Sequence, residues 1–164
     1  MAVTLDQVRQ WLDSDEPNYK RLAKLGIQLL PHLNTLVRGT IVSRAAKAAS
    51  LAGLMDSDRA VELLSTAAKH PSPIVRLAAA GALRDMKRPA AAAVLMSLLT
   101  DRDGGVRKLA IKSASVRPNA ALMAKITELG SKDPVAGVRL VAAKLAGQRG
   151  QAGLDVIRVA MTTS

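Results

Sequence analysis

The feature that most constrains the fold is a five-residue motif, Val-Arg-x-x-Ala, that returns every 31 or 32 residues. It occupies residues 75–79, 106–110 and 138–142. Residues 42–46 form a related copy that begins 33 residues before Val75 and has Ser43 in place of the arginine. Self-similarity at this period is typical of repeat proteins, in which each repeat is a supersecondary unit that buries its apolar face against its neighbours.

Each copy of the motif lies on a predicted helix. Val75, Ala79, Ala82 and Leu83 have the i, i+4, i+7, i+8 spacing of one helix face, and the small side chains allow another helix to approach closely. Turn-forming residues precede each copy, for example at 101–105, and a second apolar-periodic segment precedes each turn. The predicted unit is therefore helix A, a tight turn and helix B.

This pattern predicts a single all-α domain over residues 1–164, a short right-handed α-solenoid of about four to five helix pairs. Residues 1–26 form an N-terminal capping helix pair, in which Thr4 and Gln7 have the spacing of a capping box. Residues 27–148 hold four repeats, and residues 149–164 a last helix centred on 154–161. That last helix either docks on another chain or packs back on the fourth repeat, and the polar C-terminal residues favour packing back.

The repeats resemble HEAT-like repeats, in the form Asp-x-x-x-x-Val-Arg-x-x-Ala first noted in phycobilisome lyases. Residues 101–110 and 133–142 match this form fully, whereas His70 replaces the aspartate before Val75. The resemblance implies a ladder of ion pairs between the turn aspartate and the helix B arginine. We expect Asp101 to pair with Arg107 and Asp133 with Arg139 in such a ladder, to which Arg76 also belongs.

Composition excludes several classes of protein. The chain has no cysteine, which rules out disulfide scaffolds, thiol nucleophiles and cysteine-bound metals. Apolar residues make up 49% of the chain, enough for a core, but no uncharged apolar run approaches the ~18 residues of a membrane span. The N-terminus lacks the pattern of a secretory signal. We therefore expect a cytoplasmic protein that does not enter membranes.

Few residues suggest catalysis. His32 and His70 lie in different repeats without a carboxylate at metal-ligand spacing, and no nucleophile-elbow, zinc-protease or phosphate-loop motif is present. From this we expect no catalytic residues, no metal, no cofactor and no enzymatic activity.

Outward positions of helix B are more informative. If i, i+4 and i+7 point inward, then i+2, i+5 or i+6 and i+9 point outward. In HEAT-like solenoids the B helices line the concave face, so the resemblance places these positions toward a partner. The predicted partner-binding residues are Arg44, Lys47, Leu77, Arg84, Lys108, Ile111, Lys112, Leu140 and Lys144. They combine cations with aliphatic side chains and include no acid.

The net charge of +11 is concentrated after the first helices, since residues 1–19 are net acidic and residues 20–55 contain no acid. A one-signed groove attracts an acidic partner. The first hypothesis is an interaction module or adaptor for an acidic protein or peptide, acting alone or as a subunit of a larger complex. The alternative is nucleic-acid binding through phosphate contacts, although the groove lacks aromatic residues for base stacking. A lyase or chaperone role, as in the phycobilisome-lyase relatives, is a third possibility.

Overall fold

The computed structural model describes residues 2–162 of the chain, and side chains as far as residue 149. These residues form ten α-helices, two short 3-10 helices and no strand, which confirms the all-α prediction. No helix in this part of the chain is both long and apolar enough to cross a membrane. The helices are α1 (Leu5–Asp13), α2 (Tyr19–Ala23), η1 (Gly26–Leu29), α3 (Leu30–Val37), α4 (Val42–Ala52), α5 (Asp58–Ala67), α6 (Pro73–Ala82), η2 (Leu83–Asp85), α7 (Ala90–Leu98), α8 (Gly104–Ala114), α9 (Ala120–Lys132) and α10 (Ala136–Thr162).

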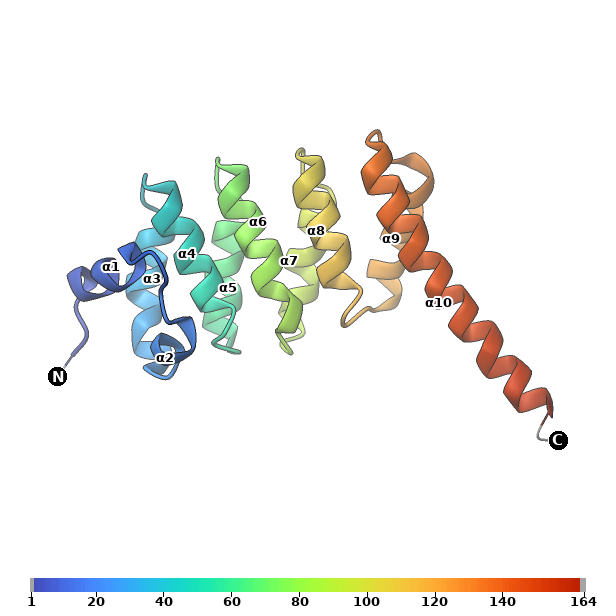
Figure 1. Cartoon of the computed structure of the whole chain (residues 1–164), viewed down its shortest axis with the longest axis horizontal. Coiled ribbons are helices and arrows are strands. Elements are labelled where there is room, and N and C mark those ends of the chain that lie inside the picture. The colour runs from blue at the N-terminus through green and yellow to red at the C-terminus, as the bar shows by residue number, and fades with distance from the viewer. Residues whose placement is uncertain (1, 163–164) are drawn as a thin grey trace.

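The helices stack as pairs into an elongated, two-layered array (Figure 1). The A helices α3, α5, α7 and α9 form one layer, and the B helices α4, α6, α8 and α10 form the other. Each inner B helix packs against its own A helix and against the B helices on either side. The side chains buried between the layers are leucine, valine, alanine, methionine and isoleucine, which form one continuous core.

The B helices begin at residues 42, 73, 104 and 136, so successive repeats are offset by 31, 31 and 32 residues. This register differs from the predicted one for the first repeat, where an offset of 33 aligned Val42 with Val75. In the structure Val42 corresponds to Pro73, and Ala45 corresponds to Arg76. The burial pattern agrees, because Ala45, Ala48 and Ala52 are fully buried and the residues 31 positions later, in α6 and η2, are buried too. Arg44 therefore occupies the position of the buried Val75.

Small residues set the spacing between B helices. A Cβ atom placed on Gly53, at the end of α4, would lie 2.6 Å from the Cβ of Ala82 in α6. Such a separation is far inside van der Waals contact, so the two helices approach this closely only because residue 53 is glycine. The alanine-rich composition of the B helices has the same effect along the rest of the stack.

The N-terminal cap is built as the sequence predicts. Thr4 Oγ1 accepts a hydrogen bond from Gln7 N at 3.3 Å, and Gln7 Oε1 accepts one from Thr4 N at 2.9 Å, which completes a capping box. Val8 and Leu12 are fully buried against the first repeat. His32 Nε2 lies 2.9 Å from the carbonyl oxygen of Val3 and ties the chain start to α3.

The C-terminal end differs from the prediction. Instead of a separate last helix at 154–161, α10 runs without interruption from Ala136 to Thr162 (Figure 1). The predicted break near residue 149 is absent because residues 147–153, although rich in glycine, contain no proline and continue the helix. Whether this segment packs back on the fourth repeat depends on side chains beyond residue 149, which lie outside the described ones.

Candidate partner-binding face

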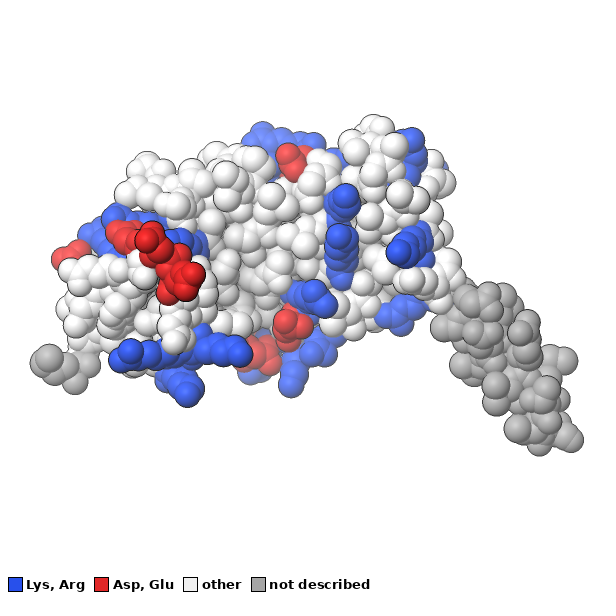
Figure 2. Space-filling model, in the orientation of Figure 1, with Lys and Arg blue, Asp and Glu red and all other residues white. Residues whose placement is uncertain are grey.

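The outer surface of the B helices, here called the B-helix face, carries cations and no acid. It consists of the exposed side chains of α4, α6, α8 and α10 up to residue 149, and none of these helical segments contains Asp or Glu. Figure 2 shows this face: uncharged side chains cover the middle of the stack, basic ones lie over α8 and α10, and the largest acidic group lies at the N-terminal end, with smaller acidic groups at the upper and lower edges.

Two rows of equivalent positions run along the B-helix face. The first row contains Ala46, Leu77, Lys108 and Leu140, and the second contains Ser50, Gly81, Lys112 and Lys144. Leu140 is 71% exposed, the largest exposed fraction among the large apolar side chains that the structure describes. The predicted residues Lys108, Lys112, Leu140 and Lys144 therefore lie together on the C-terminal half of the face, and Leu77 is half-buried beside them.

Ile111 does not belong to this face. It was predicted to point toward a partner, but its side chain is fully buried in the core. Because α8 packs against B helices on both sides as well as against an A helix, a larger part of its surface is buried. Position i+5 lies in that buried part. Positions i+2, i+6 and i+9 lie outside it, as the half-buried Leu77 and the exposed Gly81 and Arg84 do on α6 and η2.

Arg44 and Lys47 are already occupied by the N-terminal cap. Arg44 Nε and Nη2 donate to the two carboxylate oxygens of Asp13 at 2.7 and 2.6 Å. Lys47 Nζ donates to the carbonyl oxygens of Leu12 at 2.7 Å and Ser14 at 3.0 Å, at the C-terminal end of α1. The hydrogen bond from Arg44 holds the pKa of Asp13 below its ordinary value. The cap thus covers the first end of the B-helix face.

A shallow hollow lies between α4 and α6, where the sequence analysis predicted no site. Its volume is about 250 Å³, and it is lined by Ser50, Gly53, Leu54, Ala78, Gly81, Ala82 and Asp85. Glycine and alanine create it, because small residues on adjacent helices leave the surface between them recessed. The signal in the sequence was the run of small residues on the outward side of α6.

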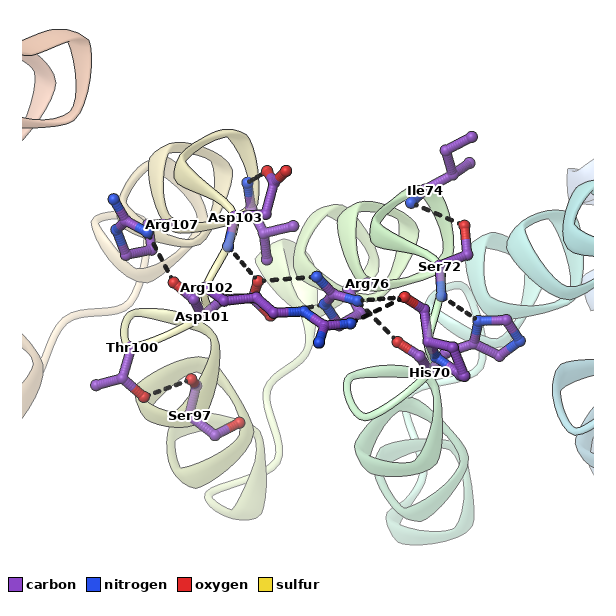
Figure 3. Close-up of polar contacts among 12 residues, drawn as sticks. His70, Ser72, Ile74, Arg76, Ser97, Thr100, Asp101, Arg102, Asp103 and Arg107 are labelled. Atoms are coloured by element: carbon purple, nitrogen blue, oxygen red, sulfur yellow. Dashed lines mark hydrogen bonds and ion pairs between the residues drawn. The ribbon is translucent and has the colours of Figure 1, made fainter. Parts of the chain in front are cut away.

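Ion pairs connect successive repeats, and Figure 3 shows the one between Arg76 and Asp101. Arg76 Nε donates to Asp101 Oδ2 at 2.8 Å, and Arg107 Nε donates to Asp133 Oδ2 at 2.7 Å. Each arginine also donates to a main-chain oxygen of its own repeat: Arg76 to His70 at 2.9 Å, and Arg107 to Asp101 at 2.8 Å. Both arginines are buried, and each one donates to groups of two repeats, which joins those repeats.

The predicted partners in this ladder were wrong. Asp101 pairs with Arg76 of the preceding repeat, not with Arg107, and Asp133 pairs with Arg107, not with Arg139. The side chain of Arg139 instead donates to the main-chain oxygen of Asp133 at 2.7 Å. A helix B arginine reaches the turn carboxylate of the next repeat because stacking brings that turn alongside its own. The hydrogen bond from Arg107 lowers the pKa of Asp133.

The rung between the first two repeats is missing. Ala45 occupies the arginine position of the first repeat, and His70 occupies the aspartate position of the second. His70 keeps one part of the aspartate's role, because its Nδ1 accepts a hydrogen bond from Ser72 N at 3.0 Å, as Asp101 Oδ1 does from Asp103 N at 2.9 Å. Within the described residues, no cluster of three or more His, Asp or Glu side chains could hold a metal ion.

A solved structure supports this description of the fold. A chain in the structure of the complex of CpcE and CpcF of phycocyanin lyase from Nostoc sp. PCC7120 matches with a TM-score of 0.70 and 20% sequence identity. The match covers 86% of this chain and 96% of the other. At this identity, the likeness shows a shared fold. The search of curated proteins gave no significant match.

The same match corrects the prediction about activity. Because the sequence contains no familiar catalytic motif, the protein was predicted not to be an enzyme. The matching chain is part of a complex named for a lyase, so a chain with this architecture takes part in an enzyme. The absence of familiar motifs was therefore an unsound reason for that expectation.

The family follows from the repeats themselves. A family model described as HEAT repeats matches residues 22–115, which is more than half of the chain. These residues extend from α2 through α8 and include the first rung of the ladder, between Arg76 and Asp101. The chain belongs to the HEAT-repeat family.

Proposed function

We propose that this chain is a protein-interaction module that holds an acidic, partly apolar segment of a partner on the C-terminal half of its B-helix face. The observation that carries the proposal is the exposure of Leu140 among lysines on a face without acids. Leu140 and Lys108 occupy equivalent positions of adjacent helices, and Lys112 and Lys144 form the next row.

These side chains have complementary effects on binding. Lysines on a face without carboxylates attract an acidic segment and speed its association. Leu140 supplies the apolar contact, because burying a leucine that is exposed in the free protein contributes about 1.5–3 kcal/mol. A partner helix or tail with acidic residues flanking an apolar one matches both requirements.

The chain contains an internal example of this recognition. At the N-terminal end of the same face, the carboxylate of Asp13 is held by Arg44, and the last carbonyl groups of α1 accept from Lys47. Basic B-helix residues therefore bind an acidic helix end within this protein. Because Arg44 and Lys47 are engaged in this way, the lysines of the B-helix face that are left to bind a partner are those on α8 and α10.

Reversing two lysines tests the proposal. The partner is first captured from native lysate with and without nuclease and identified by mass spectrometry. Its affinity is then measured by calorimetric titration for the wild type and the K108E/K112E variant. We expect at least a ~10-fold loss of affinity with an unchanged melting temperature, since both lysines are exposed.

The K20E/K24E variant is the matched control. It reverses two exposed lysines with the same i, i+4 spacing, Lys20 on α2 and Lys24 at its C-cap, at the N-terminal end of the stack rather than beside α8 and α10. An equal loss of affinity in both variants would show that only the overall charge matters and would contradict the proposal. Capture that depends on intact nucleic acid, with affinity that falls steeply with salt, would favour the phosphate-contact alternative instead.

A second candidate is a subunit role in a lyase complex, favoured by the match that spans nearly a whole chain of the phycocyanin lyase structure. That structure is a complex of two named components, so the corresponding partner would be a second protein chain. Co-purification of this chain with a second helical-repeat protein at fixed stoichiometry would support this role. Analytical ultracentrifugation showing only a monomer in native extract would argue against it.

A further inference from the structure

A second hollow lies beside η2, where one repeat passes into the next. It has a volume of about 250 Å³ and lies between the segment from η2 to the start of α7 and the end of α8. Four cationic side chains line it, namely Arg84, Lys87, Arg88 and Arg117, and no carboxylate does. We call it the basic hollow.

Three of these cationic side chains form no ion pair within the described part of the chain, although the main-chain N–H of Lys87 donates to Asp56 Oδ1 at 3.0 Å. Arg84, Lys87 and Arg117 are exposed and form no ion pair with any side chain that the structure describes. Arg88 is partly engaged, because its Nε and Nη2 donate to the main-chain oxygen of Asp56 at 3.1 and 2.9 Å. Its Nε also lies 3.7 Å from the Asp56 carboxylate. The basic hollow therefore carries a strong local excess of positive charge.

A buried hydroxyl group lies in the same place. Ser113, on α8, is only 2% exposed and contributes to the lining of the basic hollow. Its Oγ atom is buried and has no hydrogen-bond partner among the described residues. By contrast, Oγ of the nearby Ser115 donates to the main-chain oxygen of Lys112 at 2.7 Å. A buried polar group without a partner is costly, and a bound ligand would supply the missing hydrogen bond.

The start of α7 adds two further features. Its N-cap residue is Pro89, which lines the basic hollow and has no side-chain acceptor for the first main-chain N–H groups. Helices α5, α6, α8 and α9 are all capped by a serine, aspartate or asparagine side chain. The main-chain N–H groups of Ala91 and Ala92 already donate to the carbonyl oxygens of Arg88 at 3.0 Å and Pro89 at 3.2 Å, so the start of α7 contributes its helix dipole to the basic hollow.

We propose that the basic hollow binds a phosphoryl group carried as a phosphate monoester. A phosphate monoester has close to two negative charges at neutral pH and three acceptor oxygens. Arginine forks match its geometry, the Ser113 hydroxyl offers a further donor, and the dipole of α7 favours a negative charge near its start. This site shares Arg84 with the predicted partner-binding residues but contains none of Lys108, Lys112, Leu140 and Lys144, so the proposal does not depend on the protein partner discussed above.

Calorimetric titration of the full-length chain tests the site directly. Inorganic phosphate and a phosphoserine peptide are titrated into the wild type, the R84Q/R117Q variant and the K20Q/K24Q control. Each variant removes two exposed positive charges, but only the first alters the basic hollow. We expect saturable binding that falls at least ~10-fold in R84Q/R117Q and changes less than ~2-fold in the control. Equal losses in both variants, or no saturable binding to the wild type, would overturn the proposal.

The S113A variant separates ligand binding from structure. Removing a buried, unpaired hydroxyl should leave the melting temperature unchanged or raise it, while the affinity for phosphate falls several-fold. An affinity equal to that of the wild type would remove Ser113 from the site and contradict the proposal as stated. Comparison of the two ligands identifies the source: tighter binding of the phosphoserine peptide indicates a phosphorylated protein, and equal binding indicates free phosphate.

Discussion

Arg107 joins two repeats by donating to both carboxylate oxygens of Asp133, from Nε at 2.7 Å and from Nη2 at 2.8 Å. Its remaining nitrogen, Nη1, donates to the main-chain oxygen of Asp101 in its own repeat. Arg107 is 7% exposed and Asp133 is 3% exposed, so little solvent screens the pair. A repeat protein is held together only by contacts between neighbours, which gives such a pair more influence than a surface ion pair has.

Replacing Asp133 with asparagine should destabilise the protein by about 3 kcal/mol, because it leaves the buried Arg107 without its counter-charge. Asparagine keeps the size of the side chain and an acceptor for Val135 N, which donates to Asp133 Oδ1. Urea unfolding measures the effect. The control is E128Q, which breaks the more exposed pair with Lys125 and should cost less than about 1 kcal/mol. Equal effects of the two variants would contradict a special role for the buried pair.

The same pair predicts how stability depends on pH. Because Arg107 lowers the pKa of Asp133 below the ordinary value of 3.8, the carboxylate is more acidic in the folded chain than in the unfolded one. Its stabilising contribution is therefore complete above pH ~4 and is lost as pH falls through the folded-state pKa. Thermal unfolding between pH 7 and pH 2 should show a drop for the wild type below pH ~4. D133N should show a smaller drop, and parallel curves would contradict this assignment.

The architecture could be predicted from sequence because its signals are local. The spacing of Val75 and Ala79 indicates a helix face, and Thr4 with Gln7 indicates a helix start, without any knowledge of the stack. The period then implies that equivalent helices lie side by side. The family match over residues 22–115 agrees with this interpretation.

The errors concern contacts between repeats, which the sequence pattern of a single repeat does not contain. Ile111 is buried because neighbouring B helices cover it, and Asp133 pairs with Arg107 because stacking places successive turns together. The first repeat was misaligned by two residues because Val42, at the start of α4, has the same spacing to an alanine as the valine of the motif. The ion pair between Arg44 and Asp13 depends on the path of the N-terminal segment. The sequence contains no signal for that path as clear as the repeat motif.

Building the missing rung tests the structural register of the first repeat. Ala45 and His70 occupy the positions that Arg76 and Asp101 occupy one repeat later, so the A45R/H70D variant should create an additional cross-repeat pair. Each single substitution should destabilise the chain, because A45R buries an unpaired cation and H70D lacks its partner. A double-mutant cycle by urea unfolding should give a favourable coupling of about 1–3 kcal/mol. The register would be wrong if the two effects were simply additive.

Two glycines on the B helices should respond in opposite ways to alanine. At Gly53, a Cβ atom would lie 2.6 Å from Cβ and 2.8 Å from the main-chain oxygen of Ala82, so G53A must push α4 and α6 apart. Overpacking of this kind costs about 1–3 kcal/mol. At Gly81, the nearest atom to the added methyl is Leu109 Cδ2 at 3.8 Å, an ordinary contact.

G81A should therefore be neutral or stabilise the protein by up to about 1 kcal/mol, because alanine is the better residue within a helix. Each variant adds one methyl group, G53A against α6 from the end of α4 and G81A against Leu109 of α8 from α6, so each serves as the control for the other. Urea midpoints that fall for G53A and hold or rise for G81A would show that the spacing of α4 and α6 depends on the absence of a side chain at position 53. Equal shifts would mean that the helices adjust freely, which the close packing of the stack argues against.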